Sequence, residues 1–162
     1  MTKPPHKIRF ATAADVPLIL SFIRELAEYE KLAHEVTADE ATLTHTLFGP
    51  KAYAEALIAE VGDEPAGFAL FFHNFSTFLG KPGIYLEDVY VRPAFRSNGI
   101  GMAFFKALAR IAQERDCGRL EWWVLDWNGP AIAFYKKIGA QPMDEWTVQR
   151  LTRVEIDKLA ES

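Results

Sequence analysis

The sequence predicts an α/β fold with a central mixed sheet, mostly antiparallel and turning parallel near its end, flanked by helices. Three β-rich runs follow one another between residues 54 and 91 with only short turns between them, which is typical of antiparallel strands. A long amphipathic segment over residues 98–115 then separates the third run from another at 120–125. A helical crossover of this length joins parallel strands, so the sheet is expected to be mixed.

The first part of the chain predicts one strand and two helices. Lys7–Ala11 is expected to be a short strand. Asp15 then caps a helix in which apolar residues recur with the 3.6 period over residues 16–27. A second, shorter helix follows the capping-box sequence Thr37–Glu40 and ends at Gly49-Pro50.

The middle of the chain predicts the antiparallel strands. Ala54–Val61 and Ala66–Phe72 are expected to form a hairpin around the turn residues at 62–65. Lys81-Pro82-Gly83 predicts the next turn, and Ile84–Val91 the strand after it.

The last part predicts helices that alternate with strands. The expected elements are, in order, the helix Asn98–Arg115 with Gly118 just beyond its end, the strand Leu120–Leu125, the helix Pro130–Ile138 ended by Gly139, the strand Thr147–Leu151 and the helix Arg153–Ala160.

The length and composition assign residues 1–162 to one globular domain. The chain is 49% hydrophobic and 25% charged, which excludes disordered, collagen-like and coiled-coil proteins. Its one cysteine, Cys117, cannot form an internal disulfide and suits a reducing compartment. The longest apolar run, Ala66–Phe72, is too short to span a membrane, and the first seven residues do not resemble a signal peptide. We therefore expect a cytoplasmic protein without a membrane partner.

Charge is distributed unevenly along the chain. The net charge of −4 argues against a nucleic-acid partner. Residues 13–40 hold seven acidic and two basic side chains, whereas residues 92–119 hold six basic and two acidic ones. This division would suit one cationic and one anionic ligand, or simply two solvated helix faces.

Two glycines stand where a strand, a short basic loop and a helix are predicted to meet. Free N–H groups at a helix start bind anions, and glycine lets a phosphate approach the backbone. The spacing of Arg96, Gly99 and Gly101 resembles the pyrophosphate loop of acetyl-coenzyme A transferases. A P-loop would need Gly-Lys-Ser/Thr, and the dinucleotide fingerprint would need a third glycine at Phe104. A glycine-rich helix start without a ligand is the alternative.

Two adjacent carboxyl groups, Glu87 and Asp88, interrupt an otherwise apolar strand. Because side chains alternate along a strand, the two are expected to point to opposite faces of the sheet. Burial would raise the pKa of such a carboxyl, which suits a general base that takes a proton from an ammonium group. A salt bridge to an arginine of a neighbouring element is the structural alternative for each acid.

Tyr135 lies on the same predicted helix face as Ala131, Phe134 and Ile138. A tyrosine so placed is commonly a core aromatic with a bonded hydroxyl. In a protein that binds coenzyme A, a tyrosine at this position can also act as a general acid. Its phenol can give a proton to the departing thiolate, since the two pKa values differ by only about 2.

These stretches together resemble the GNAT superfamily of N-acetyltransferases. Within it, the chain is similar almost end to end to the spermidine/spermine (diamine) and thialysine N-acetyltransferases. The matching stretches are Ile8-Arg9, Ala11–Asp15, Glu25–Ala27, Tyr29-Glu30, Tyr85–Asp88, Gly99–Gly101, Trp127-Asn128, Pro130, Phe134–Lys136 and Gly139-Ala140. Ser97 stands where the diamine enzymes commonly have glycine.

The resemblance implies an enzyme that moves the acetyl group of acetyl-coenzyme A to a primary amine of a small cationic substrate, without a metal. It implies that Tyr135 is the general acid and that Glu87 helps to deprotonate the amine. The implied coenzyme contacts are Val89, Tyr90, Val91, Arg96, Ser97, Asn98, Gly99, Ile100, Gly101, Met102, Asn128, Gly129, Pro130, Ala131 and Lys137. The implied substrate contacts are Tyr29, Glu30, Glu87, Glu121, Trp122, Trp123 and Glu145.

Two other functions stay open on the sequence. A non-catalytic module would keep the coenzyme A loop but would need no proton-handling residues, and a protein acetyltransferase would act on lysine or N-terminal amines. The resemblance also implies a homodimer in which acids of one chain can complete the site of the other. His34 and His45 predict no metal site, because no further cysteine or histidine completes one.

Overall fold

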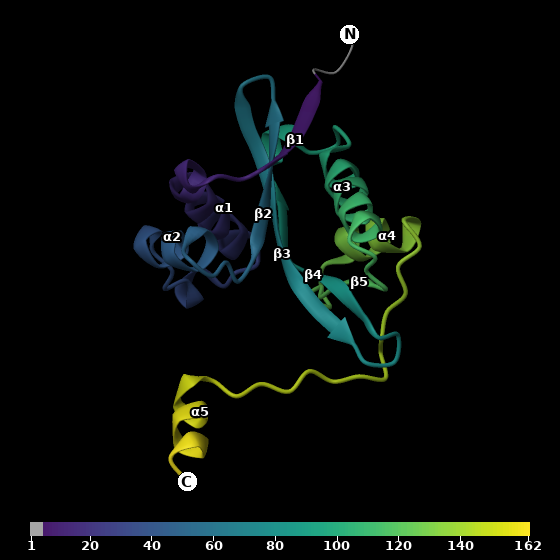
Figure 1. Ribbon diagram of the computed structural model, residues 1–162. Coiled ribbons are helices and arrows are strands. Elements are labelled where there is room, and N and C mark those ends of the chain that lie inside the picture. Colours follow the sequence, from purple (N-terminus) through teal and green to yellow (C-terminus); the bar gives the residue numbers. More distant parts are fainter. Residues whose placement is uncertain (1–4) are drawn as a thin grey trace. The chain divides into compact units, whose positions relative to one another are not determined.

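The structure is a computed structural model that describes residues 5–162, and these residues form two compact units that divide between Trp123 and Val124. The five-stranded sheet lies in the first unit (Figure 1). The helices and strands of this unit are β1 (His6–Phe10), α1 (Val16–Tyr29), α2 (Glu40–Phe48), β2 (Glu55–Val61), β3 (Glu64–Ser76), β4 (Lys81–Val91), α3 (Ile100–Glu114) and β5 (Leu120–Trp122). The second unit contains α4 (Gly129–Lys137) and α5 (Arg153–Ala160).

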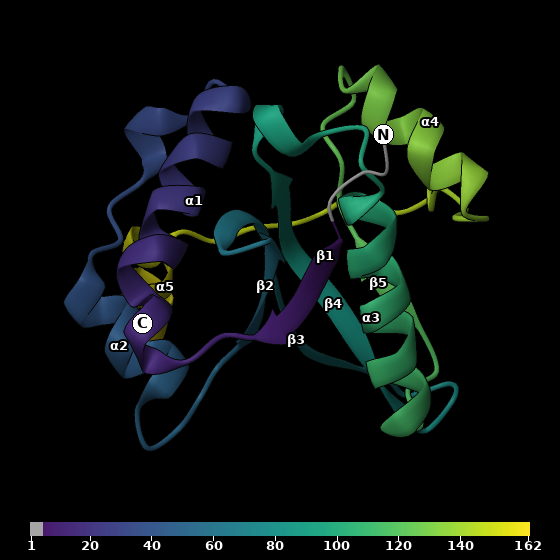
Figure 2. The same ribbon diagram turned by 90° about the horizontal axis from the view of Figure 1, so that it is seen from above.

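The sheet confirms the predicted mixed α/β fold. Its strand order is β1-β2-β3-β4-β5, so each strand pairs with its neighbour in the sequence. The first four strands are antiparallel, and β5 runs parallel to β4 after the crossover through α3. Helices α1 and α2 lie on one face and α3 on the other (Figure 2). Both faces are thus covered, as the apolar strands require.

Alternation along the strands divides the core into two layers. On the α1 face, the ring of Phe68 stacks on Phe22 at 5.3 Å, and Tyr90 meets Phe22 edge-on at 6.3 Å. On the other face α3 packs against β4, where Phe104 and Leu86 are buried. Each buried side chain of this size contributes roughly 1.5–3 kcal/mol, so both layers hold the central strands in place.

The predicted helices form, but two of their caps differ from the prediction. Asp15 occupies the N-cap position of α1 without capping it. Its carboxylate accepts from the backbone N–H of Thr12, in a capping box around the short 3-10 turn Ala13–Asp15, and from the Arg9 guanidinium. The second helix is capped by Asp39, which accepts from the N–H of Thr42, and not by Thr37.

Two of the predicted strand boundaries and the residue predicted to end the helix α3 are wrong. Lys81-Pro82-Gly83 belongs to β4, because the tight turn lies earlier, at residues 77–80. The strand expected over Leu120–Leu125 ends at Trp122. The left-handed residue after α3 is Asp116, with φ of 52°, and not Gly118.

The second unit contains the two predicted helices, but the strand expected over Thr147–Leu151 does not form. Residues 146–152 are irregular, and Trp146, Val148 and Leu151 are exposed. A strand needs a partner for its backbone groups, and this segment pairs with none of the described strands. The assignment of residues 1–162 to one domain stays a prediction.

Among the described residues, no helix combines the length and apolarity that a bilayer crossing requires. The first seven residues were predicted not to resemble a signal peptide. Residues 1–4 of this segment lie outside the described residues.

Candidate functional site

The second half of β4 has an open edge. On one side, β3 pairs with β4 along its whole length, from Lys81 to Val91. On the other side, β5 pairs only with Ile84, Tyr85 and Leu86. Within the first unit, the backbone groups of residues 88–91 that point toward β5 therefore face no strand. An extended ligand that carries amide groups can pair with such an edge as an added strand would.

A β-bulge marks the point where the pairing with β5 stops. Leu70 of β3 faces Asp88, whereas the next residue, Phe71, faces Leu86. Glu87 is therefore the extra residue of β4, without a counterpart on β3. Bulges bend a strand and re-aim its side chains, and they are frequent beside active sites.

The bulge places Glu87 and Asp88 on the same face of the sheet, so the predicted alternation is wrong here. Leu70 and Phe72 share a face of β3, and their counterparts on β4 are Asp88 and Tyr85. Glu87 follows Tyr85 by two residues and shares its face by ordinary alternation. Both carboxyl groups therefore lie on the face that packs against α1, where Glu87 is exposed and Asp88 is half-buried.

Electrostatics distinguish Asp88 from the other acids of the first unit. Burial, together with the nearby charges of Glu87 and Glu30, raises the pKa of Asp88 to about 7. Glu30 follows the last turn of α1, and burial raises the pKa of its carboxyl as well. The predicted carboxyl with a raised pKa exists, but it is Asp88. The sequence signal was the acid in an apolar strand, and only the bulge decides which of the two acids is enclosed.

The start of α3 offers main-chain donors. The first helical hydrogen bond runs from the N–H of Ala103 to the carbonyl of Gly99 at 3.0 Å, and no side chain caps the first turn. The N–H groups of residues 100–102 thus point out of the helix start. Ser97 and Gly99 hold the preceding loop in left-handed conformations, with φ of 64° and 81°. This geometry fits a diphosphate, as the glycine spacing predicts.

Arg96 lies in that loop and turns toward α1. Its Nε donates to the carbonyl of Val91 at 2.9 Å. Its guanidinium lies 5.1 Å from the ring centre of Tyr29 and 5.7 Å from that of Tyr90. The structure thereby brings the predicted coenzyme residue Arg96 next to Tyr29, a predicted substrate residue.

The short strand β5 divides the remaining predicted substrate residues of the first unit between the two faces. Trp122 packs on Phe105 of α3, with ring centres 4.8 Å apart, and Trp123 packs on Tyr85 at 5.8 Å. Glu121 pairs with Tyr85 in register and lies on the same face as Trp123. Trp122 thus lies on the opposite face of the sheet from Glu87, whereas Glu121 and Trp123 lie on the same face as Glu87.

The second unit contains the other predicted residues on and around α4. Asn128 caps this helix by accepting from the N–H of Ala131 at 3.3 Å. Tyr135 is half-buried, and its ring meets that of Phe134 edge-on at 5.8 Å. The remaining predicted residues of this unit, Gly129, Pro130, Lys137 and Glu145, are exposed. Tyr135 and β4 belong to different units, so the proximity of the Tyr135 phenol to the open edge of β4 stays a prediction.

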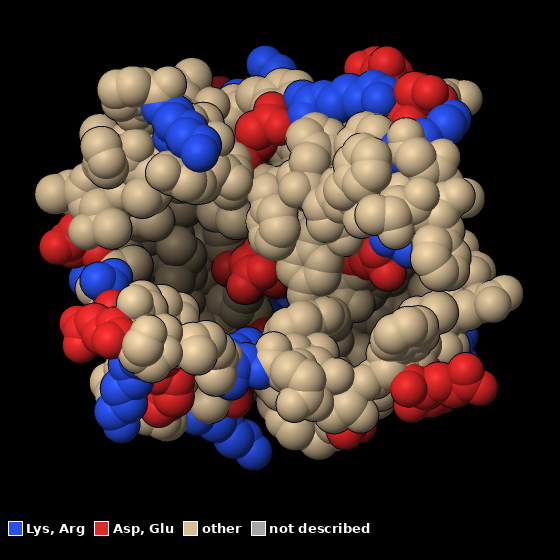
Figure 3. Space-filling model, turned by 60° about the horizontal axis from the view of Figure 1, so that its bottom comes forward, with Lys and Arg blue, Asp and Glu red and all other residues tan. Residues whose placement is uncertain are grey.

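The uneven charge of the sequence is partly neutralised in the fold. Arg92, from the basic segment, binds both carboxylate oxygens of Glu25, from the acidic segment, at 2.9–3.2 Å. It also donates to the carbonyl of Pro65 at 3.0 Å and lies over the ring of Phe22. On the face drawn in Figure 3, acidic and basic side chains are interspersed. Arg92 anchors the end of β4 to α1 through this ion pair, and no local sequence signal marks it as a functional residue.

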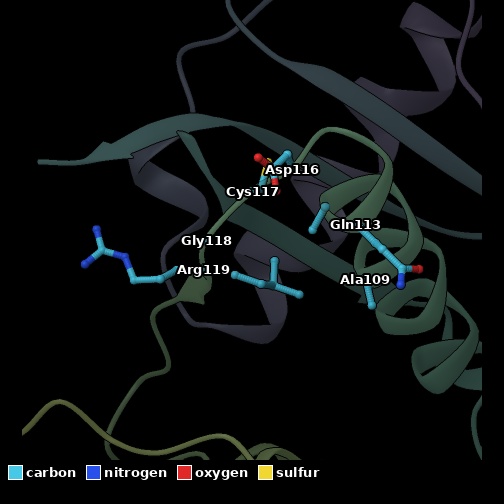
Figure 4. Close-up of a pocket in the computed structure, with 8 residues that line it drawn as sticks. Ala109, Gln113, Asp116, Cys117, Gly118 and Arg119 are labelled. Atoms are coloured by element: carbon cyan, nitrogen blue, oxygen red, sulfur yellow. The ribbon is translucent and has the colours of Figure 1, made fainter. Parts of the chain in front are cut away.

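An open hollow of about 430 Å³ lies between the end of α3 and the start of β5 (Figure 4). Its lining includes Gln113, Asp116, Cys117 and Arg119. These residues lie at the opposite end of α3 from the predicted diphosphate loop. Among the residues that the structure describes, no group of three or more histidine, cysteine, aspartate and glutamate side chains could hold a metal ion.

Comparisons with known proteins show the family of the chain. Residues 20–140 match the sequence model of the acetyltransferase (GNAT) family. The thialysine N-epsilon-acetyltransferase of Bos taurus is 40% identical over 146 residues, which cover 85% of each chain. The L-ornithine N5-acetyltransferase of Arabidopsis thaliana is 32% identical and covers 90% of this chain and 84% of its own.

Solved structures share the fold. An integron cassette protein from the mobile metagenome of V. cholerae superimposes with a TM-score of 0.80 and 29% identity, over 97% of this chain and 98% of its own. A metagenomic aminoglycoside acetyltransferase, solved in complex with sisomicin, superimposes with a TM-score of 0.73 and 18% identity, over 91% of this chain and 94% of its own. At that identity, the second likeness shows the fold alone.

Proposed function

Since the chain belongs to the GNAT acetyltransferase family and is an N-acetyltransferase, we propose that it moves the acetyl group of acetyl-coenzyme A to a primary amine of a small cationic substrate. A diamine, a polyamine or a thialysine-like amino acid is the expected acceptor. The observation that carries the proposal is the open edge of β4 leading into the uncapped start of α3. It is supported by similarity to a thialysine N-epsilon-acetyltransferase over 85% of the chain.

In this proposal the coenzyme extends from β4 to α3. The backbone of residues 89–91 pairs with the amide groups of the pantetheine arm, and the N–H groups at 97–102 bind the diphosphate. Arg96 adds positive charge beside that loop. In the second unit, residues 128–131 and Lys137 supply further coenzyme contacts.

The acidic residues bind the ammonium groups of the substrate. Glu30 and Glu87 lie on the α1 face of the first unit, and Tyr29 stands beside Glu30 at the end of α1. No lysine or arginine forms an ion pair with either acid among the described residues, so their charge is available to a cation. Glu121, Trp122, Trp123 and Glu145 remain proposed contacts of the rest of the substrate.

The proposed reaction is direct and sequential. The neutral amine attacks the thioester carbonyl carbon, a C–N bond forms and the C–S bond breaks, without an acyl-enzyme. Glu87 binds the ammonium and helps to remove its proton, and Tyr135 gives a proton to the leaving thiolate. Holding both reactants together contributes the larger share of the rate, because it converts a bimolecular step into a unimolecular one.

An amine panel tests the substrate class. Purified protein is incubated with acetyl-coenzyme A and, in turn, spermidine, a simple diamine, thialysine, ornithine and a lysine peptide, and release of coenzyme A is followed. We expect the small cationic amines to be acetylated faster than the peptide. Preference for the peptide would indicate a protein acetyltransferase. Coenzyme binding without transfer to any amine would indicate a non-catalytic module.

The variant Tyr135→Phe tests the general acid. We expect kcat to fall about 10²-fold while the affinity for coenzyme A is unchanged, because only the proton donor is removed. Tyr53→Phe is the matched control, since Tyr53 is 61% exposed and belongs to no predicted site. Wild-type turnover by Tyr135→Phe would remove Tyr135 from the mechanism.

The proposal includes a homodimer in the cytoplasm, as the resemblance implies. The second unit leaves large apolar side chains exposed, which gives a second copy a surface to cover; they are Trp127, Met143, Trp146, Val148, Leu151, Val154, Ile156 and Leu159. Light scattering of the purified protein at micromolar concentration is expected to give twice the chain mass, and a monomer mass would contradict it.

A further inference from the structure

Asp88 is an enclosed carboxyl that the proposed mechanism leaves without a role. It faces Leu70 on β3 and lies on the α1 face, two residues before the buried Tyr90. Among the described residues, no lysine, arginine or histidine forms an ion pair with it. A half-buried acid without a cation is costly for a fold, which points to a functional reason for keeping it.

Apart from Glu30, the other partly buried acids of the first unit are paired. Asp15 and Glu60 both bind Arg9, at 2.8 and 2.9 Å. Glu25 binds Arg92 at 2.9 Å, and Glu55 binds Arg115. Arginine therefore neutralises the acids that hold elements together, whereas Asp88 and Glu30, whose charge acts on Asp88, have no arginine partner in the described part of the chain.

The charges that act on Asp88 come from β4 and from the residue that follows α1. These charges are those of Glu87 and Glu30. Tyr90 follows Asp88 by two residues on β4, and the Arg96 guanidinium lies 5.7 Å from its ring centre and 5.1 Å from that of Tyr29. Glu25, also on α1, is neutralised by Arg92. Arg92 is thus engaged with another acid and Arg96 with aromatic rings, and a cationic substrate would be the partner of the carboxyl groups.

The bulge gives the two adjacent acids different surroundings. Glu87 is exposed to water, whereas Asp88 is half-buried and is the first residue of the open edge of β4. A thioester bound along residues 89–91 would lie beside the segment of β4 that directly follows Asp88. The two carboxyl groups are on the same face, and the charge of Glu87 acts on Asp88.

We propose that Asp88, in place of Glu87, takes the proton from the attacking ammonium group, while Glu87 beside it binds the charge of the substrate; this rests on the proposed acetyl transfer. One proton of the ammonium moves to the Asp88 carboxylate, and the neutral nitrogen forms its bond to the carbonyl carbon. A second proton leaves nitrogen as the C–S bond breaks, and the thiolate takes up one proton. Asp88 then releases its proton to water, so the reaction yields amide, free thiol and one proton.

The raised pKa of Asp88, about 7, supports this role because a general base is most effective when its pKa is near the working pH. It also predicts the effect on stability. The folded state holds this proton more tightly than the unfolded state, so ionisation of Asp88 destabilises the fold as pH rises from about 4 to about 7. Asp88→Asn removes that penalty. Its Tm at about pH 8 is expected to equal or exceed that of the wild type.

The test compares Asp88→Asn with Glu87→Gln, using the best amine of the panel and a pH profile from about pH 5 to 9. In the wild type we expect kcat/KM to rise with an inflection near the pKa of Asp88. Asp88→Asn should lose this inflection and about 10²-fold in kcat near neutral pH, with the loss shrinking toward alkaline pH as free amine accumulates. Glu87→Gln should raise KM and keep the inflection. Asp116→Asn, an exposed acid paired with Lys81, is the matched control.

Three outcomes would overturn the proposal. The first is an unchanged profile and rate in Asp88→Asn, and the second is loss of the inflection in Glu87→Gln alone. The third is a lower Tm of Asp88→Asn at about pH 8 with a matching loss of coenzyme A binding, which would make Asp88 a structural residue. Wild-type protein that transfers acetyl to no amine would refute the proposed function itself, and this proposal with it, so the two failures are distinguishable.

Discussion

Asp15 is the residue whose removal should destabilise the first unit in a way that depends on pH. Its two carboxylate oxygens accept from Nη1 and Nη2 of Arg9, at 2.8 and 2.9 Å, and one also accepts from the N–H of Thr12 at 2.7 Å. This arrangement ties β1 to the start of α1. Asp15→Asn keeps the shape of the side chain but removes its charge and one of its two acceptor oxygens, so it breaks the paired hydrogen bonds from Arg9.

The magnitude follows from the pKa of the carboxyl. The hydrogen bonds from Arg9 lower the pKa of Asp15 from 3.8 to about 2. A tenfold change in proton affinity is about 1.4 kcal/mol, so the ionised form contributes about 2.4 kcal/mol to the free energy of unfolding. Because the folded state binds this proton less tightly, the contribution is complete above about pH 4 and disappears as the pH falls through about 2. Near pH 3 about half of it remains.

Urea unfolding at pH 7 and at about pH 3 tests this. Asp15→Asn is expected to lower the free energy of unfolding by about 2 kcal/mol at pH 7 and by about half as much at the lower pH. Asp116→Asn is the control, because it breaks an exposed pair with Lys81 that is expected to contribute less than about 1 kcal/mol. A loss that is equal at both pH values would refute the reasoning, since it would not come from ionisation of Asp15.

Two further predictions concern the diphosphate loop and the core. Ser97 and Gly99 both have positive φ, so Ser97→Gly should raise the free energy of unfolding by roughly 0.5–1 kcal/mol and Gly99→Ala should lower it by roughly 1–2 kcal/mol. A Cβ on Gly99 would meet no atom of the described residues within 4 Å, so the loss in Gly99→Ala would come from the backbone conformation and not from a clash. Thermal unfolding measures both, and a stabilising Gly99→Ala would show that the loop is not left-handed. Phe104→Ala should cost about 3–5 kcal/mol because Phe104 is fully buried, whereas Phe78→Ala, at a fully exposed position, should cost less than about 0.5 kcal/mol. Equal losses in urea unfolding would contradict the assigned core.

Much of the candidate site could be predicted because its signals are local. The glycines at 99 and 101 follow a strand and open a helix, and the uncapped helix start has the expected form. The stacking of Trp122 and Trp123 on different partners also follows from strand alternation alone. Arg96 was predicted as a coenzyme residue, but its position over Tyr29 depends on the approach of α1 to β4 and has no local signal.

The sequence by itself determined the order of the elements, the mixed sheet and the family, because hydrophobic periods, turn residues and motif spacing are properties of neighbouring residues. Only the tertiary structure decided where β5 stops, that Thr147–Leu151 forms no strand, and that Asp15 binds Arg9. It also decided that a bulge at Glu87 places two carboxyl groups on one face and encloses Asp88. The physical reason is that strand length, register and burial depend on partners distant in the chain, whose hydrogen bonds and packing no local pattern encodes.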